Sequence, residues 1–155
     1  MKIKVLAVGP KMPAWVNDGA GDYLKRLPRE LPVEFVTLSL GNRGKNQPAE
    51  KAIAQEGDSM LAAIRDSDHV VALDLQGQAW STEQLSGQLQ HWREQAKDVI
   101  ILIGGPDGLD PRALARADQR WSLSNLTLPH PLVRVLLAEQ VYRAWSISQN
   151  HPYHK

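Results

Sequence analysis

The sequence predicts a single α/β domain in which a mostly parallel sheet is covered by helices on both faces. Short runs rich in β-branched residues alternate with segments of helical spacing along the 155 residues, which is the order expected when helices join parallel strands. The run VIILI within residues 98–104 is apolar without alternation. That pattern is typical of a central strand buried on both faces, so helices are expected on each side of the sheet.

Four strands are expected, each bounded by turn-forming residues, at 2–8, 33–40, 69–75 and 98–104. Helices are expected between them, at 13–27, 48–65 and 81–95. Pro48 suits a first helical position, and Ser81 with Glu83 and Gln84 resembles a capping box. The segment 41–48 has two glycines and two basic residues but no large apolar side chain, which predicts a mobile surface loop.

The last third of the sequence is less regular. Residues 104–118, GGPDGLDPRALARAD, are assigned to no element. The short run QRWSLS at 119–124 is expected to form a fifth strand. A loop with two prolines then leads into a long helix at 132–149.

The composition limits the classes of function. Lys and Arg number 18 against 17 Asp and Glu, so binding to a polyanion needs a local basic patch. The absence of cysteine excludes disulfides, thiolate zinc sites and cysteine nucleophiles, and it favours a reducing cytosol. The N-terminal run MKIKVLAVGP is too short for a signal peptide, and no window reaches the length of a membrane span. We therefore expect a soluble, cytoplasmic protein.

Ligands of an open parallel sheet bind outside the carboxyl ends of its strands, so the segments that follow strands are the candidate binding segments. These segments are LDLQGQAW, IGGPDG and SLSNLTLPHP. Gly104, Gly105 and Gly108 permit close backbone approach to a planar ligand or a phosphate, or they merely form a turn that ends the strand. No Lys-Ser/Thr pair follows, and the glycine spacing differs from the dinucleotide pattern, so neither a Walker loop nor a dinucleotide fingerprint is present.

The segment SLSNLTLPHP carries more information. Pro129 and Pro131 fix their own φ angles and restrict the preceding residues, so the loop is stiff and mostly extended. Flat leucine walls with free backbone groups suit an adenine ring. A connection that fills the core without a ligand is the alternative, and the pattern alone does not decide between the two. His130, between the prolines, is expected to serve loop packing.

The helix that begins at Leu132 is apolar at almost every angle, which indicates that it is buried on more than one side. The sheet covers one side, and a second copy of the chain is the simplest cover for the other. Arg143 lies four residues after Glu139, which predicts either an ion pair or an arginine held for a substrate phosphate. The tail NHPYHK either frays or places Tyr153 and His154 against a base. His151 and His154 lack carboxylate or thiol partners nearby in the sequence, so no metal site is expected.

These stretches together carry a resemblance to a known family. LIGGPDG, VGPKMPAWV and WSLSNLTLPHPLVRVLLAEQVYRAWSISQNHPYHK resemble the SPOUT-class methyltransferases that modify N3 of a pseudouridine in bacterial large-subunit (23S) ribosomal RNA. The likeness covers essentially the whole chain, including RGKN at 43–46. It implies one SPOUT-type domain over 1–155, a C-terminal trefoil knot that forms the S-adenosylmethionine site, and a homodimer. Nothing in the periodicity indicates a knot.

The resemblance also assigns residues. It implies that Arg143, Tyr153 and His154 handle the target nucleotide, with the tail of one subunit completing the site of the other. The cofactor contacts that it implies are Leu73, Gly105, Ser124, Asn125, Leu126, Thr127, Leu128 and Pro129.

The resemblance further implies action on assembled ribosomes, and the near-neutral charge agrees with weak binding to free RNA. The candidate basic contacts are Lys11, Lys25, Arg26, Arg29, Arg43 and Lys45. Two alternatives stand beside this function. The first is a nucleotide-dependent phosphotransferase that uses GGPDG as its phosphate cradle, against which the missing Lys-Ser/Thr pair counts. The second is a non-catalytic ribosome-binding module, against which the stiff apolar loop and the complete tail count.

Overall fold

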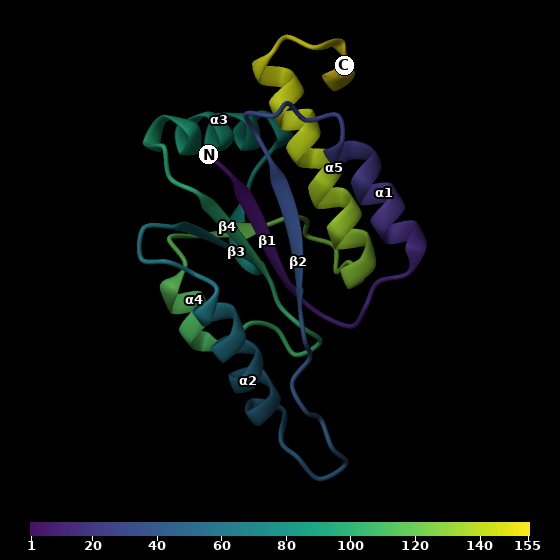
Figure 1. Cartoon of the computed structure of the whole chain (residues 1–155), viewed down its shortest axis with the longest axis vertical. Helices are drawn as coiled ribbons and strands as arrows, with labels where there is room; N and C mark the ends of the chain where they lie inside the picture. The colour runs from purple at the N-terminus through teal and green to yellow at the C-terminus, as the bar shows by residue number, and fades with distance from the viewer.

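The computed structural model describes every residue from Met1 to Lys155 and contains a five-stranded parallel sheet with helices on both faces (Figure 1). The sheet has the order β2-β1-β4-β3-β5, and every neighbouring pair is parallel. The strands are β1 (Ile3–Val8), β2 (Val33–Leu38), β3 (His69–Ala79), β4 (Val99–Ile103) and β5 (Gln119–Ser122). All residues of β4, the central strand, are buried, so the predicted fold class and the predicted position of VIILI are confirmed.

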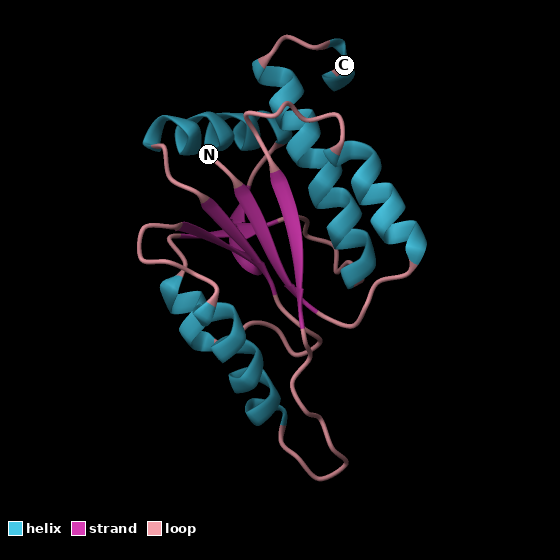
Figure 2. Ribbon diagram, in the orientation of Figure 1, coloured by secondary structure: helices cyan, strands magenta, loops and turns pink.

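The helices divide between the two faces of the sheet (Figure 2). One face carries α1 (Ala14–Leu24), α3 (Thr82–Gln95) and α5 (His130–Ser148), and a short 3₁₀ helix (Pro152–His154) follows α5. The other face carries α2 (Ala49–Ala62) and α4 (Pro111–Arg116). Successive residues of β4 point to opposite layers, as Ile101 packs with Leu137 of α5 while Leu102 packs with Met60 of α2. No helix combines the length and hydropathy that a bilayer span requires.

The sequence predicted the starts of two helices, and the structure confirms one of them and moves the other by one residue. The Ser81 hydroxyl accepts a hydrogen bond from the Gln84 backbone at 3.1 Å, and the Gln84 side chain accepts from the Ser81 backbone at 2.8 Å. The capping box that the sequence predicts is therefore confirmed, with Gln84 as its partner. Pro48 differs slightly from the expectation, because it caps α2 in an extended conformation and the helix begins at Ala49.

Two elements differ from the sequence-based prediction. β3 continues to Ala79, with an irregular register between Leu73 and Gln78 along β5. The unpredicted helix α4 starts at Pro111, and the side chain of Asp110 caps it by accepting from the Arg112 backbone at 2.8 Å. The extension of β3 depends on its pairing with β5, which a local pattern does not contain. The start of α4 does carry a local signal, an aspartate cap followed by a proline, which the sequence analysis did not use.

The connections around the two neighbouring strands β1 and β4 position the candidate site. α1 follows β1 on one face of the sheet, whereas α4 follows β4 on the other face. The chain therefore leaves the carboxyl ends of these neighbours in opposite directions and opens a crevice between them.

The helices α2 and α4 meet closely at Gly57. A Cβ added to this buried residue would overlap the carboxylate of Asp110, the α4 cap. We expect Gly57→Ala to lower the free energy of unfolding by about 1–3 kcal/mol through overpacking, measured by urea denaturation.

Gly87→Ala is the matched control, because Gly87 also lies inside a helix but has no atom within 4 Å of an added Cβ. This variant should gain about 0.5–1 kcal/mol from the lower backbone entropy of the unfolded chain. Equal effects of the two substitutions would contradict the packing described here.

Candidate functional site

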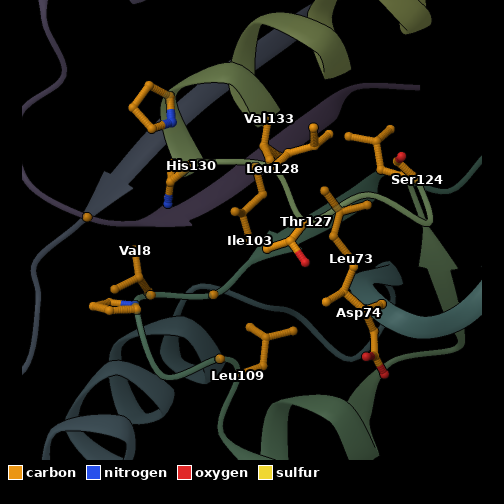
Figure 3. Close-up of a pocket in the computed structure, with 18 of the residues that line it drawn as sticks. Val8, Leu73, Asp74, Ile103, Leu109, Ser124, Thr127, Leu128, His130 and Val133 are labelled. Atoms are coloured by element: carbon orange, nitrogen blue, oxygen red, sulfur yellow. The ribbon is translucent and has the colours of Figure 1, made fainter.

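A cavity of about 700 Å³ lies at the carboxyl ends of β1, β3 and β4, in the crevice between β1 and β4 (Figure 3). Four segments form most of its lining: 8–12 at the end of β1, 73–76 within β3, 103–109 at the end of β4, and 123–133, which comprises a loop and the first turn of α5. The three segments that the sequence marked as candidate binding segments all contribute to this one cavity. Its volume lies within the range of small-molecule and cofactor sites.

The walls of the cavity are mainly apolar. Leu73, Ile103, Leu109, Leu128 and Val133 face it (Figure 3). Leu75 and Leu126 at its rim are 63% and 70% exposed, so apolar surface remains available to a ligand.

The charged groups of the cavity are few. Asp74 lines it and is held 3.9 Å from Arg120, but no lysine or arginine belongs to the lining. A triphosphate in this cavity would therefore meet no cationic side chain, which counts against the phosphotransferase alternative.

The glycine turn after β4 has a structural role and also lines the cavity. The Gly108 N–H donates to the Gly105 carbonyl at 3.0 Å, and Gly108 has a φ of +86°, which favours glycine. A Cβ on Gly104 would lie 2.8 Å from the Gly108 backbone. The two interpretations of these glycines therefore coexist, because the same turn ends the strand and exposes backbone to the cavity.

The loop 123–129 is held by its own side chains. The Ser124 hydroxyl accepts from the Leu126 backbone at 2.9 Å, and the Ser122 hydroxyl donates to the Ser124 carbonyl at 3.2 Å. The backbone N–H groups of Thr127 and Leu128 donate to no group of the chain and are free to bind a ligand. Leu126 and Thr127 are exposed, so this part of the loop does not fill the core.

Six of the eight residues that the resemblance assigns to the cofactor line the cavity: Leu73, Gly105, Ser124, Leu126, Thr127 and Leu128. The other two, Asn125 and Pro129, belong to the same loop but are exposed and do not line it. The cavity also contains Met12, Asp74, Leu109 and His130, which the sequence analysis did not assign to it. Asp74 and His130 belong to two of the candidate binding segments, and Met12 and Leu109 follow β1 and β4, so these positions in the sequence were the available signal.

His130 does more than pack the loop. Its Nε2 accepts a hydrogen bond from Nε of Arg134 at 2.9 Å, so the neutral imidazole carries its proton on Nδ1. Burial and then the Arg134 charge lower the pKa of His130 below its ordinary value of 6.5. The sequence predicted a role in loop packing for His130, and the structure adds a hydrogen bond to Arg134 and a place in the lining of the cavity.

A buried carboxylate braces the cavity from behind. Glu56 of α2 is 4% exposed, accepts from Nη1 of Arg43 at 2.6 Å, and accepts from the Gly41 backbone at 2.9 Å. Arg43 also donates to Asp107 of the glycine turn at 2.9 Å. These bonds raise the pKa of Arg43 and tie the segment 41–48 to α2 and to the turn. Arg43 is thus fixed in an ion-pair network, although the sequence suggested a mobile loop with a free basic contact.

The other candidate basic contacts divide into two groups. Lys25 and Arg26 both pair with Asp22, at 3.1 and 2.9 Å. Lys11, Arg29 and Lys45 form no ion pair and are exposed. The cations available to an anionic partner are therefore fewer than the sequence count suggests.

The residues assigned to the target nucleotide lie together at the far end of α5. One carboxylate oxygen of Glu139 accepts from Nε of Arg143 at 2.7 Å and from the Tyr153 hydroxyl at 3.2 Å. The Arg143 guanidinium lies 4.8 Å from the Tyr153 ring centre, and His154 contacts the His151 carbonyl. Desolvation and then Glu139 raise the pKa of Tyr153 to about 12. The tail is folded against α5, so the alternative of a frayed tail is wrong.

This tail cluster does not reach the cavity of its own chain. Arg143 lies 13 residues after His130, which is about 20 Å along the helix axis. Figure 1 shows the tail beyond the amino-terminal ends of the strands, whereas the cavity lies at their carboxyl ends. The residues predicted to contact the cofactor and those predicted to handle the nucleotide therefore form two separate groups within one chain.

Comparisons with known proteins agree over the whole length. The chain matches the family model described as "Predicted SPOUT methyltransferase" over residues 1–154. It is 59% identical over 155 residues to the ribosomal RNA large subunit methyltransferase H of Chromohalobacter salexigens, covering 100% of both chains. The proteins of the same name from Marinomonas sp. strain MWYL1 and Hahella chejuensis are 56% and 55% identical, with 100% of this chain and at least 99% of theirs covered.

The contact between His130 and Arg134 predicts a pH dependence of stability. Folding lowers the pKa of His130 below its unfolded-state value of 6.5. The stability that the neutral imidazole contributes is therefore fully present above pH 6.5 and is lost as the pH falls toward the lower, folded-state pKa. We expect the melting temperature of the wild type to fall more between about pH 7.5 and about pH 5 than that of His130→Gln. The glutamine keeps an acceptor for Arg134 but does not titrate.

His91→Gln on the exposed face of α3 is the control, and its melting curve should follow the wild type across the same range. If His130→Gln showed the same pH profile as the wild type, the neutral, hydrogen-bonded imidazole would be refuted.

Proposed function

The chain belongs to the SPOUT methyltransferase family, and we propose on that basis that it methylates large-subunit (23S) ribosomal RNA with S-adenosylmethionine as the methyl donor. The observation that carries this proposal is the apolar cavity at the crevice between β1 and β4, closed by the stiff leucine loop. Six of the cofactor residues implied by the resemblance line it. A ribosomal RNA substrate is also consistent with the cytoplasmic location that the sequence predicts.

The residues of the cavity fit the proposed cofactor. The leucine walls and the free N–H groups of Thr127 and Leu128 suit an adenine ring. When bound, S-adenosylmethionine supplies a methyl group already activated by the positive charge on its sulfur. A cavity with the carboxylate of Asp74 and no cationic side chain tolerates that charge.

We propose N3 of a pseudouridine as the acceptor atom. Because the donor is already activated, the chain mainly has to hold N3 in line with the methyl carbon at about 3–3.5 Å. It must also favour loss of the imide proton, which a positive charge near the base promotes. Arg143 is the cation assigned to this role, and Tyr153 and His154 would hold the ring. Tyr153, with its raised pKa, stays protonated at neutral pH and acts as a hydrogen-bond donor.

A homodimer would bring the tail cluster to the cavity. Gly19 of α1 lies against Val135 of α5, and nearby on these two helices Trp15, Leu132 and Leu136 are 53%, 42% and 38% exposed. Large apolar side chains gathered on packed helices mark an interaction surface. A second copy seated there would cover them, and its tail is proposed to complete this chain's site. The trefoil knot stays a prediction of the resemblance.

The proposal is tested with methyl-labelled S-adenosylmethionine and ribosomes that lack the modification. Label should appear at N3 of one pseudouridine of the large-subunit RNA, as mapped by mass spectrometry. A short naked hairpin of the same sequence should be methylated at least about tenfold more slowly, because few unpaired cations are available for free RNA. Comparable rates on hairpin and ribosome would refute action on assembled particles, and absence of label would refute the function.

Completion of the site by the partner's tail predicts complementation between two inactive variants. Arg143→Ala should lose methylation far more than affinity for the cofactor, measured by calorimetry. The double variant Leu126→Asp, Leu128→Asp should lose cofactor binding, because both side chains line the cavity. A mixture of the two should recover up to about a quarter of wild-type activity, since half of the dimers contain one intact site of two.

His154→Ala provides a second tail variant, because Arg143→Ala leaves Glu139 without its cation. No recovery with either tail variant, under conditions where subunits exchange, would mean that the tail does not act on the partner's cavity.

The dimer itself is tested at Leu136. Leu136→Glu places a charge among the exposed apolar residues of α1 and α5 and should shift the protein to monomers, as measured by analytical ultracentrifugation. Ser59→Glu on the exposed face of α2 adds the same charge elsewhere and should leave the oligomeric state unchanged. A wild type that sediments as a monomer would overturn the proposed assembly.

A further inference from the structure

Arg134 of α5 is a buried cation without a counter-charge. The residue is 3% exposed, its Nε donates to His130 at 2.9 Å, and its Nη1 donates to the Thr37 hydroxyl at 3.0 Å. Its Nη2 is buried and has no partner. No carboxylate lies within ion-pair distance, in contrast to Arg43 and Arg143, which both have one.

Burial of a cation without a counter-charge lowers the free energy of unfolding, unless other groups replace the hydration that the cation has lost. A buried charge needs a partner of opposite sign or several hydrogen bonds, and Arg134 has two neutral acceptors only. Burial lowers the pKa of Arg134, because it removes water from the charged guanidinium. A missing anion is the simplest completion of this site, because an anion would accept from Nη2 and neutralise the guanidinium.

Arg134 faces a second hollow next to the cavity. The lining of this hollow, of about 470 Å³, includes the polar residues Lys11, Asn17, Thr37, Ser39 and Arg134 and contains no acidic residue. Four residues line both spaces, so the hollow and the cavity share a wall: Gly9, Pro10, Met12 and Leu40. Lys11 is exposed and forms no ion pair, which places a second available cation at the hollow's edge.

We propose that Arg134 and Lys11 form a subsite for a backbone phosphate of the substrate RNA, beside the methyl-donor cavity. The inference rests on the proposed function, because it takes RNA as the substrate. Two cations, a hydroxyl pair and an amide suit the charged oxygens of a phosphodiester. The shared wall lets a nucleotide direct its base toward the cavity while its phosphate lies against Arg134. The subsite thus positions the substrate, and it supplies the positive charge that the cavity itself lacks.

Arg134→Gln removes the charge but keeps a polar side chain of similar reach. For methylation of ribosomes, we expect kcat/KM to fall about 10- to 100-fold, as for the loss of one or two charge-assisted hydrogen bonds, while cofactor affinity stays within about twofold. Arg134→Lys should recover part of the loss. Lys97→Gln removes one charge from an exposed residue before β4, at the opposite ends of the strands, and should behave as wild type.

A carboxylate of the cofactor is the other anion that could occupy this hollow, and calorimetry separates the two sources. A parallel loss of cofactor affinity in Arg134→Gln would overturn the assignment to RNA. A lower melting temperature of Arg134→Gln with unchanged kcat/KM would show a purely structural residue and would also overturn it.

A third measurement does not depend on methylation. Inorganic phosphate should raise the melting temperature of the wild type and of Lys97→Gln, but not that of Arg134→Gln. If ribosomes accept no methyl group while phosphate still stabilises through Arg134, the proposed function fails and the anion subsite stands. If phosphate raises the melting temperature of wild type and Arg134→Gln equally, the subsite fails whatever the activity.

Discussion

The whole arrangement depends on α5, a helix that has to be buried on two sides. Its inner side packs on the sheet, where Leu137, Val141 and Ala144 are at most 3% exposed. Its outer side keeps Leu132 and Leu136 open to solvent. The same helix begins at the cavity and ends at the tail cluster, so its length keeps these two groups apart within one chain. The proposed second copy on the outer side would cover these side chains and would also bring a tail cluster to the cavity.

The distribution of charge around the cavity separates two tasks. The cavity has one carboxylate and no cation, which suits a donor that itself carries a positive charge. Across the shared wall, Arg134 and Lys11 supply positive charge without an acidic residue beside them. A cation placed among the leucines would repel the proposed methyl donor, whereas a cation behind the shared wall can attract the proposed RNA substrate. The positions of these few charges therefore matter more than the net charge of the chain.

Buried carboxylates hold the loops around the cavity in place. Glu56 ties the segment 41–48 to α2, and through Arg43 it reaches the glycine turn. Asp110 caps α4 and packs against Gly57, so it joins α4 to α2. Ser122 and Ser124 hold the leucine loop in a similar way. A site whose walls are fixed before a ligand arrives loses less conformational entropy on binding, which suits a reaction governed by alignment.

The sequence by itself determined the α/β class, the central position of β4, the capping box at Ser81 and the three segments that line the cavity. These follow from periodicity, from local hydrogen bonding and from the rule that parallel strands present their carboxyl ends together. The stretches that resemble SPOUT methyltransferases pointed to the family to which the chain belongs.

Only the tertiary structure decided that Arg43 is paired, that Arg134 is not, and that His130 faces the cavity. It also placed Arg143 and Tyr153 at the end of α5 that lies away from the loop 123–129 of the same chain. The physical reason is that the burial and pairing of a charge depend on residues distant in sequence. Glu56 lies 13 residues from Arg43, and Thr37 lies 97 residues from Arg134, so no local pattern contains either contact.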